Sequence, residues 1–306
     1  MESCASADMS MLMTQIIPAL YMVLCVLALP LNAACLITFV WRIPEKKPAV
    51  IYMMSLAGVN LLFSLFVPLK IFCHFSVRSG IWTFTSAACR SSTALFYFSM
   101  SCVTSLIMSI SLDRMLAVAY AMPSRTYRTS RNAVLLCVLV GFLALGSSLP
   151  FFLSTRVQQN QTLLNCSQLW DNEDDLYLHQ FPYVFCVFFL LPTLVTSVCY
   201  SLFMWALWKI PLGTSSLVSR TKRRSLVLLF LIVTILLLFF LPLNVVLLLR
   251  GHHRRSEEEK LYPAYLLSLC AAGSSVSLGP LVYYFGSKQV QHELDSVWRH
   301  VSRWRK

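Results

Sequence analysis

The sequence of 306 residues predicts an all-α membrane protein: a seven-transmembrane helix bundle with a short amphipathic helix at the C-terminus. Hydrophobic residues make up 57% of the chain and charged residues only 12%, about half the charged share of an average soluble domain. Seven stretches of 22 to 33 residues contain no Asp, Glu, Lys or Arg, and about 20 helical residues are enough to cross a hydrocarbon core. These stretches are 9–41, 48–69, 91–112, 132–155, 176–208, 225–249 and 261–287.

The uncharged stretches set the expected helices, which we place over 12–41, 49–73, 86–118, 131–153, 181–209, 222–249 and 261–285. The next longest uncharged stretch, 157–170, has only 14 residues and is rich in Asn and Gln, so we interpret it as a loop. Prolines lie inside or near the ends of the helices, where a neighbouring helix or water can bind the carbonyl that each proline leaves without a donor. They are Pro30, Pro68, Pro150, Pro192, Pro242 and Pro280.

The N-terminal segment does not resemble a secretory signal peptide. Residues 1–10 (MESCASADMS) are acidic rather than basic, and the following apolar run is far longer than the apolar part of a signal peptide. We therefore expect a retained first helix after a short extracellular arm of residues 1–11. A transmembrane domain over 12–286 and a cytoplasmic amphipathic helix over 287–306 complete the expected organisation.

Lys and Arg are distributed unevenly between the two sides of the predicted bundle. The segments 42–48, 114–131, 209–224 and 288–306 lie on one side and carry 17 of the 25 basic residues. Because basic loops favour the cytoplasm, we expect a multi-pass protein of the plasma membrane with its N-terminus extracellular. The outer loop 250–260 is an exception, since it holds four bases and three acids. This distribution accounts for the net charge of +12 without nucleic acid as a partner.

The last twenty residues have a different pattern. Five apolar residues recur there at spacings of three and four, which places them on one face of a helix, and bases occupy the other face. This pattern predicts a short helix on the inner membrane surface, in contact with membrane lipids. The apolar residues are Val290, Leu294, Val297, Val301 and Trp304.

The chain lacks the residue patterns of an enzyme. Among the acidic residues only Asp113 lies at the edge of an expected span in a membrane context, so no pair of carboxylates is available there for acid–base chemistry. No HExxH, CxxC, GxSxG or phosphate-binding glycine loop occurs. We expect no catalysis, no cofactor and no metal site, and we interpret His252 and His253 as solvated. The lack of buried acids also disfavours an ion-coupled transporter but leaves a facilitative carrier open.

Two cysteines are placed differently from the nine others. Cys89 lies at the outer start of the third expected helix, and Cys166 lies in the long outer loop around residues 154–180. Both face the oxidising side in the predicted topology, where the two could form a disulfide. Spacing alone leaves Cys4 and Cys73 as alternative partners, because both are near the outer face.

The same outer loop holds candidate glycosylation and ligand-binding residues. The triplets NQT and NCS make Asn160 and Asn165 candidates for N-glycosylation. Downstream, the run DNEDD gathers acids that would attract a cationic ligand, such as a peptide with a free amine or an Arg. The alternative is a solvated loop. The acids are Asp171, Glu173, Asp174 and Asp175.

Short motifs in this order and at these depths resemble the rhodopsin-like (class A) G-protein-coupled receptors over nearly the whole chain. The motifs are LPLN (29–32), SLAGVNLLF (55–63), LDRM (112–115), Pro192 with Tyr200, FLP (240–242) and GPLVY (279–283). The resemblance implies a heterotrimeric G protein as partner, and it matches Cys89 and Cys166 to the family disulfide. It assigns coupling and activation roles to Asp113, Arg114, Tyr200, Phe240, Pro242, Pro280 and Tyr283.

Within that class the chain most resembles the protease-activated receptors. The relevant stretches are FVPLKIFCHF (66–75), SLDRMLAVAYAM (111–122), FFLLPTLVTSVCYS (188–201), EKLYPAYLLSL (259–269) and LGPLVYYFGS (278–287). In that subfamily a protease cuts the outer arm after a basic residue, and the new terminus binds as a tethered peptide agonist. The resemblance implies an extracellular ligand, either a peptide or another chain's protease-generated terminus. Candidate ligand contacts, besides the loop acids, are Tyr97, Glu259, Tyr262 and Tyr265.

The outer arm departs from the subfamily, because the first basic residue of the chain is Arg42. The written sequence therefore holds no trypsin-like cleavage site before its first helix. We expect either that an upstream exon supplies the arm or that another molecule supplies the ligand.

The expected mechanism centres on the inner end of the third helix. Asp113 is expected to restrain Arg114 until the sixth helix moves outward and opens a cavity for the G protein. The segment RTKRRS (220–225) contains no Glu that could form an ion pair with Arg114 and stabilise the resting state. We therefore expect measurable basal signalling. Asn60 and Gly279 replace residues that help to hold a sodium ion in many class A receptors, so we expect sodium-insensitive ligand binding.

Two other interpretations stay open. The ligand would be an anionic lipid or a nucleotide if it is bound by outer bases, namely Lys70, Arg250, Arg254 and Arg255. Alternatively, the chain is a non-signalling decoy receptor, because several core polar residues of the class are replaced. The retained Asp113 and Arg114 favour signalling.

Overall fold

The computed structural model describes residues 17–79, 86–119, 126–153, 182–208, 216–252, 258–287, 289–293 and 296, and within these ranges all regular structure is helical. The elements are α2 (Ile17–Ile37), η2 (Thr38–Arg42), α3 (Pro48–Ser79), α4 (Ser86–Ala119), α6 (Ser130–Leu153), η3 (Cys186–Leu190), α9 (Leu191–Trp208), α10 (Ser216–Thr234), η4 (Ile235–Phe240), α11 (Leu241–His252), α12 (Glu258–Ser274), η6 (Ser275–Leu278) and α13 (Gly279–Gly286). Here η2, η3 and η4 are π-helical turns, and η6 is a 3₁₀ turn.

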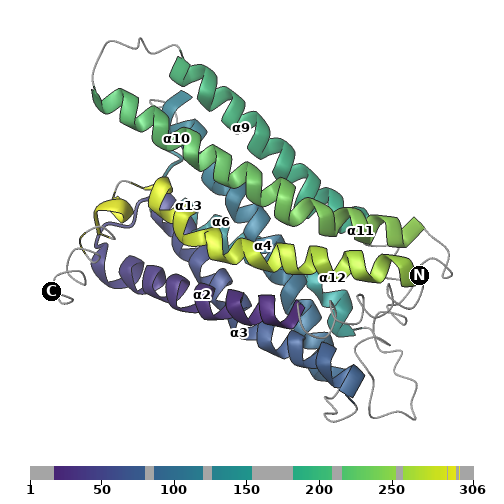
Figure 1. Ribbon diagram of the computed structural model, residues 1–306. Helices are drawn as coiled ribbons and strands as arrows, with labels where there is room; N and C mark the ends of the chain where they lie inside the picture. Colours follow the sequence, from purple (N-terminus) through teal and green to yellow (C-terminus); the bar gives the residue numbers. More distant parts are fainter. Residues whose placement is uncertain are drawn as a thin grey trace.

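These elements join into the seven helical rods of the predicted bundle (Figure 1). Within the described ranges, six helices are long and apolar enough to cross a membrane, and the first helix contributes a shorter apolar segment, Val26–Arg42. The six spans lie within α3, α4, α6, η3 with α9, α10 to α11, and α12 to α13. The predicted all-α, seven-helix fold is confirmed.

Two helices extend well beyond a predicted end, further than any other described helix does. The second helix continues to Ser79 rather than residue 73, and the sixth begins at Ser216 rather than residue 222. Both extensions contain charged residues. A charge ends the apolar stretch that fits the hydrocarbon core, but it does not end a helix, because the helix can continue into water.

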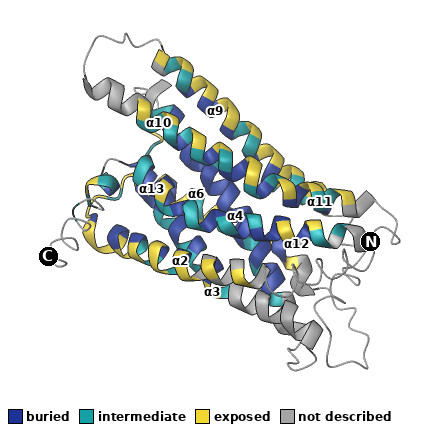
Figure 2. Ribbon diagram, viewed as in Figure 1, coloured by how far each residue is buried: buried dark blue, intermediate teal, exposed yellow. Residues whose placement is uncertain are grey.

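The burial of the helices differs according to their place in the bundle. The α4 span, Ser91–Ala117, has 72% of its most apolar window buried, whereas Ser130–Leu149 of α6 and Pro182–Ala206 have 28%. Figure 2 shows the same contrast, with α4 dark blue in the middle and yellow faces on α2, α6 and α9. Beyond the first turn of α6, its exposed side chains are large and apolar, as a lipid-facing surface requires. Helix α4 packs against α3, α6 and α9 and forms the centre of the core.

At two prolines, a polar side chain from another helix supplies the hydrogen-bond donor that the proline lacks, as expected. Pro192 cannot donate a hydrogen bond to the carbonyl of Phe188, and the hydroxyl of Thr104 on α4 donates to that oxygen at 2.6 Å. Pro280 likewise cannot donate to the carbonyl of Val276. The amide Nδ2 of Asn32 on α2 donates to that oxygen at 3.1 Å. These bonds tie the third helix to the fifth and the first to the seventh.

Replacing Thr104 by Val should lower the free energy of unfolding by about 2 kcal/mol, because the buried Phe188 carbonyl loses its donor from α4. Thr104→Ser keeps the hydroxyl and should cost much less. A suitable control is Ser197→Ala, since Ser197 is exposed and donates only to Thr193 in its own helix. Thermal unfolding of the purified protein in detergent measures all three. Equal losses for the Val and Ser variants would contradict the role of the bond.

The segment after α13 is described only in part. Residues 289–293 are helical, and Val290 is fully buried, with the backbone N–H of Gln291 donating to the carbonyl of Ser287. The rest of the expected amphipathic helix, apart from residue 296, lies outside the described residues.

Candidate functional site

The carboxylate of Asp113 is paired with Arg128, not with Arg114. The Nε of Arg128 donates to Oδ1 of Asp113 at 2.9 Å, and Nη2 donates to Oδ2 at 3.1 Å. The Asp113 side chain is 4% exposed and the Arg128 side chain 28%. The expected resting pair of Asp113 with Arg114 was therefore wrong about the partner. Neighbouring residues on a helix point in different directions, whereas Arg128 approaches from the loop before α6 with both donors aligned.

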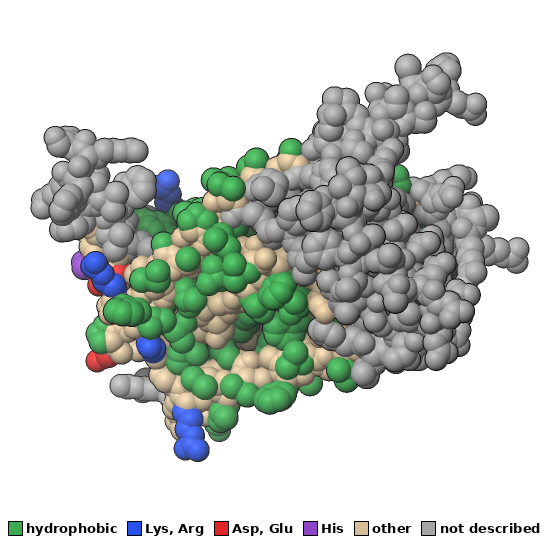
Figure 3. Space-filling model, turned by 90° about the horizontal axis from the view of Figure 1, so that it is seen from below, with side chains coloured by type: hydrophobic (Ala, Val, Ile, Leu, Met, Phe, Trp, Pro, Cys, Tyr) green, Lys and Arg blue, Asp and Glu red, His purple; other side chains and the backbone are tan. Residues whose placement is uncertain are grey.

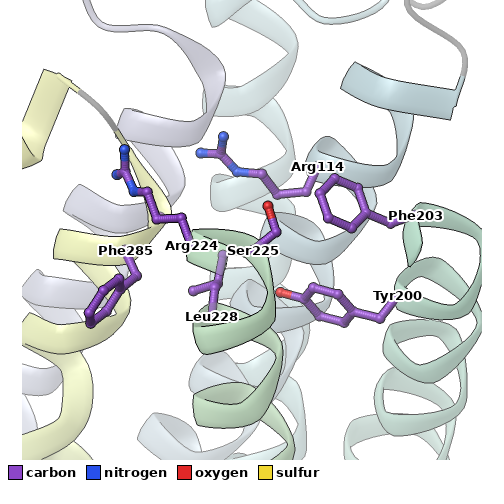
Figure 4. A pocket seen from close by; sticks show the side chains of 8 residues that line it. Arg114, Tyr200, Phe203, Arg224, Ser225, Leu228 and Phe285 are labelled. Carbon is purple, nitrogen blue, oxygen red and sulfur yellow. The ribbon is translucent and has the colours of Figure 1, made fainter. Parts of the chain in front are cut away.

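Arg114 instead lines a small cavity between the ends of four helices (Figure 4). The cavity measures about 80 Å³, which is enough for a few water molecules and far too little for a helix about 10 Å wide. The Nε of Arg114 is buried and has no hydrogen-bond partner among the described residues. The lining residues come from α4, α9, α10 and α13: Arg114, Tyr200, Phe203, Arg224, Ser225, Leu228, Phe285 and Gly286.

A second arginine links the sixth and seventh helices at this cavity. The Nη2 of Arg224 on α10 donates to the backbone carbonyl of Tyr284 on α13 at 2.9 Å. That carbonyl lies in the last turn of α13, where the carbonyl ends of the helix carry partial negative charge. A basic residue of the RTKRRS segment therefore holds the sixth helix to the seventh, without the Glu that the class often uses. Figure 4 shows the Arg114 and Arg224 guanidinium groups at the same end of the cavity.

The hydroxyl of Tyr283 lies in a buried polar cluster with Asn32 and Asn60. Asn60 Nδ2 donates to the hydroxyl at 2.9 Å, and the hydroxyl donates to Asn32 Oδ1 at 3.2 Å. The ring of Tyr283 is fully buried and packs edge-on against Phe39. In this structure Tyr283 therefore binds the first two helices and does not line the cavity beside Arg114.

Gly279 makes this position of Tyr283 possible. A Cβ added at Gly279 would lie 2.7 Å from Asn60 Nδ2, 2.8 Å from the Tyr283 hydroxyl and 3.1 Å from Asn32 Oδ1. Contacts below 3.0 Å are too close for a real Cβ. The missing side chain at Gly279 leaves the space that the tyrosine hydroxyl fills, and its three polar neighbours are amide and hydroxyl groups.

The remaining predicted activation residues lie along the same helices. Tyr200 is buried and lines the cavity, and Phe240 is buried at the end of η4. Pro242 is exposed in the first turn of α11, and Pro280 is half-buried in the first turn of α13. The sequence did not identify Arg128 as a site residue. The one feature that could have indicated it was its position in the basic segment 114–131.

The predicted ligand-binding residues are described unevenly. Tyr97 on α4 and Tyr265 on α12 are buried. Glu259 and Tyr262 lie in α12, and Cys89 lies in α4, but their side chains are outside the described part. The remaining predicted residues fall wholly outside it: Asn160, Asn165, Cys166, Asp171, Glu173, Asp174 and Asp175. The disulfide, the glycosylation sites and the acidic mouth therefore stay predictions.

Seven helices packed in one bundle with α4 at its centre, and an arginine-lined cavity at one end, are the architecture of a multi-pass membrane protein of the receptor class. The family model described as "7 transmembrane receptor (rhodopsin family)" matches residues 31–283. The chain belongs to the rhodopsin-like (class A) family of G-protein-coupled receptors, as its motifs predicted.

The similar proteins are receptors rather than enzymes. Proteinase-activated receptor 1 of Xenopus laevis is 34% identical over 289 residues, and that of Homo sapiens is 32% identical over 292 residues. In both cases the match covers 93% of this chain and 67% of the relative, so the chain spans about two-thirds of the length of these receptors. Lysophosphatidic acid receptor 6 of Mus musculus is 30% identical over 290 residues, covering 91% of this chain and 83% of that receptor. The predicted resemblance to protease-activated receptors is confirmed.

Proposed function

We propose that this chain carries an extracellular signal across the plasma membrane to a heterotrimeric G protein, with its N-terminus outside. In this proposal residues 1–11 are extracellular, 12–286 form the transmembrane receptor domain and 287–306 lie on the cytoplasmic surface. The observation that carries the proposal is the position of Arg114 in a small cavity bounded by the sixth and seventh helices. The described bases of three predicted cytoplasmic segments support this orientation, because Arg224 lines the cavity with Arg114, Arg128 is paired with Asp113 next to Arg114, and the carbonyl of Lys46 is bound by Ser130 at the start of α6.

The small size of the cavity indicates which movement accompanies signalling. A partner helix fits only if α10 moves away from α4 and α13, and that movement breaks the bond between Arg224 and the Tyr284 carbonyl. Pro242, which follows the π turn η4, is the expected pivot. Opening exposes Arg114 to the partner while Asp113 stays bound to Arg128.

Replacing Arg224 by Gln should raise basal G-protein dissociation in transfected cells about tenfold. A hydrogen bond with a charged donor contributes about 1.5 kcal/mol, and losing it from the closed state alone shifts the equilibrium by about that factor. The matched control is Arg223→Gln, because Arg223 is the exposed neighbour on the same helix and loses the same charge. The control should leave basal output near that of the unmodified chain at equal surface expression.

Adding Arg114→Ala to the Arg224→Gln variant should abolish the raised output, because the partner then loses its contact in the opened cavity. Full output from this double variant would refute the assigned role of Arg114. No output from any variant, despite surface expression, would instead support the decoy interpretation.

We further propose that the ligand is a peptide or another chain's protease-generated terminus. The similarity to proteinase-activated receptor 1 supports this class. The run 171–175 and the candidates Tyr97, Glu259, Tyr262 and Tyr265 are the proposed contacts, and a disulfide between Cys89 and Cys166 would hold the acidic loop over the bundle.

A second ligand class is favoured by one observation, the similarity to lysophosphatidic acid receptor 6. An anionic lipid would bind the outer bases Lys70, Arg250, Arg254 and Arg255 rather than the acids at 171–175. Charge reversal of the acids or of the bases, followed by ligand screening in a G-protein dissociation assay, separates the two classes. Only the set that binds the ligand should change the response.

A further inference from the structure

The cavity around Arg114 brings two guanidinium groups together without a carboxylate. Arg114 and Arg224 both line it, and the other described residues that line it are neutral. The Nε of Arg114 is buried without a hydrogen-bond partner among the described residues. Two positive charges that share a small space repel each other unless a negative charge lies near both of them. The cavity therefore favours an anion.

The helices around the cavity supply a single carboxylate, and it is already bound. Asp113 is the one acidic residue of α4, and it accepts hydrogen bonds from Arg128 at 2.9 and 3.1 Å. The sequence holds no Asp or Glu from residue 176 to residue 256, a range that contains all of α9 and α10, and α13 holds none either. A counter-charge between Arg114 and Arg224 must therefore come from outside these helices.

The cavity has the size and the donors to hold one small oxyanion. Its volume of about 80 Å³ compares with about 30 Å³ for one water molecule in the liquid, so a sugar phosphate or a nucleotide does not fit. The hydroxyls of Tyr200 and Ser225 also line it, and each can donate a hydrogen bond to an anion oxygen. Figure 4 shows the Tyr200 hydroxyl directed toward α10 and the Ser225 hydroxyl directed toward Arg114.

The surroundings strengthen the attraction of this cavity for an anion. Phe203 and Leu228 are buried and Phe285 is half-buried, so apolar side chains form much of its wall. A partly open cavity with charges of one sign and apolar walls concentrates counter-ions. Figure 3 keeps the left-to-right direction of Figure 1, and it shows Lys and Arg side chains at the end of the molecule where α10 begins and α13 ends. These bases favour the approach of an anion from that side.

We propose that one inorganic phosphate ion from the cytoplasm binds in this cavity between Arg114 and Arg224 and stabilises the resting arrangement of α4 and α10. The planar arginine side chain matches two phosphate oxygens with two parallel hydrogen bonds. A guanidinium group has five N–H donors, so Arg224 can bind the ion while its Nη2 keeps its bond to the Tyr284 carbonyl.

The ion acts as a brake on signalling because its two arginines lie on different helices. When α10 moves away from α4, Arg224 moves away from Arg114, and the ion loses half of its binding site. Phosphate therefore binds the resting state more tightly and shifts the population toward it. This consequence rests on the proposed function, which supplies the cytoplasmic orientation and the outward movement of α10.

The binding test uses the full chain, purified in neutral detergent without a G protein. Inorganic phosphate is titrated at constant ionic strength, maintained with potassium gluconate, and the midpoint of thermal unfolding is measured. A ligand of the native chain raises the midpoint with an apparent affinity that the titration defines, already at low concentration. The general salting effect of phosphate needs high concentration and is the same in every variant. A rise of that second kind alone would overturn the proposal.

Four variants locate the ion. Arg114→Gln and Arg224→Gln should each weaken the apparent phosphate affinity about tenfold, because each removes charged donors. Arg224→Lys keeps the charge and should retain most of the affinity, which guards against misfolding. Arg223→Gln is the matched control, since it removes the exposed neighbouring charge, and it should leave the affinity unchanged. An equal loss in Arg223→Gln would overturn the proposal, because total charge would then explain the effect.

Two other anions test the size and chemistry of the site. Inositol trisphosphate is too large for the cavity, so binding of it that depends equally on Arg114 would contradict the proposed location. Chloride cannot use two parallel hydrogen bonds from an arginine, and chloride that binds as tightly as phosphate would contradict an oxyanion site. Saturable phosphate binding without any G-protein dissociation in cells would instead count against the proposed function, so the two failures are distinguishable.

Discussion

Replacing Arg128 by Ala is expected to lower the free energy of unfolding by about 3 kcal/mol. The change leaves the Asp113 carboxylate buried without the two hydrogen bonds that now hold it at 2.9 and 3.1 Å. Removing one member of a buried ion pair costs about 3–5 kcal/mol, and we take the lower end because the Arg128 side chain is 28% exposed. The midpoint of thermal unfolding in detergent should fall accordingly.

The controls for this prediction separate the ion pair from the loss of a surface charge. Arg131→Ala removes an exposed base three residues away and should change the midpoint little. Asp113→Asn in the Arg128→Ala background removes the stranded charge, so the double variant should be more stable than Arg128→Ala alone. If the double variant is instead less stable by the sum of the two single losses, the two residues do not interact.

This ion pair also shows what the sequence could predict and what it could not. The position of Asp113 and Arg114 at the end of an apolar helix followed from composition and motif alone, and so did the seven helices. The sequence did not predict that Arg128 is the partner of Asp113. Arg128 lies fifteen positions away, beyond a connecting segment that has no periodic pattern from which its path could be predicted. Four bases lie in the segment 114–131, and nothing in their order distinguishes Arg128.

The substitutions in the core were easier to detect than to interpret. Gly279 and Asn60 were recognisable as departures from the class, and they predicted the loss of a sodium-binding charge. They did not predict that the Tyr283 hydroxyl would occupy the space, because this depends on the distance between the second and seventh helices. Likewise, the sequence predicted that Pro192 needs a substitute donor, but only the packing of α4 against η3 identifies Thr104 as that donor.

Gly279→Ala is expected to destabilise the protein by about 3 kcal/mol. The new Cβ would lie 2.7 Å from Asn60 Nδ2 and 2.8 Å from the Tyr283 hydroxyl, so the tyrosine must leave the cluster and give up both hydrogen bonds. Each bond contributes about 1 kcal/mol, and overpacking adds a similar amount. Gly141→Ala and Gly146→Ala are matched controls inside α6, because no atom lies within 4 Å of their added Cβ. Both should be neutral or stabilising by up to about 1 kcal/mol.

A double-mutant cycle between Gly279 and Tyr283 tests whether the hydroxyl is the group displaced. Tyr283→Phe alone removes the hydroxyl and leaves Asn60 Nδ2 and Asn32 Oδ1 without this partner, so it should cost about 2 kcal/mol. In the Gly279→Ala background the same change should cost almost nothing, because the hydrogen bonds are already broken. Additive losses would mean that the added methyl group displaces Asn60 and leaves Tyr283 in place. With its hydroxyl free of the first two helices, Tyr283 could turn toward the cavity of Arg114, so Gly279→Ala should also raise basal G-protein dissociation relative to the Gly141→Ala control.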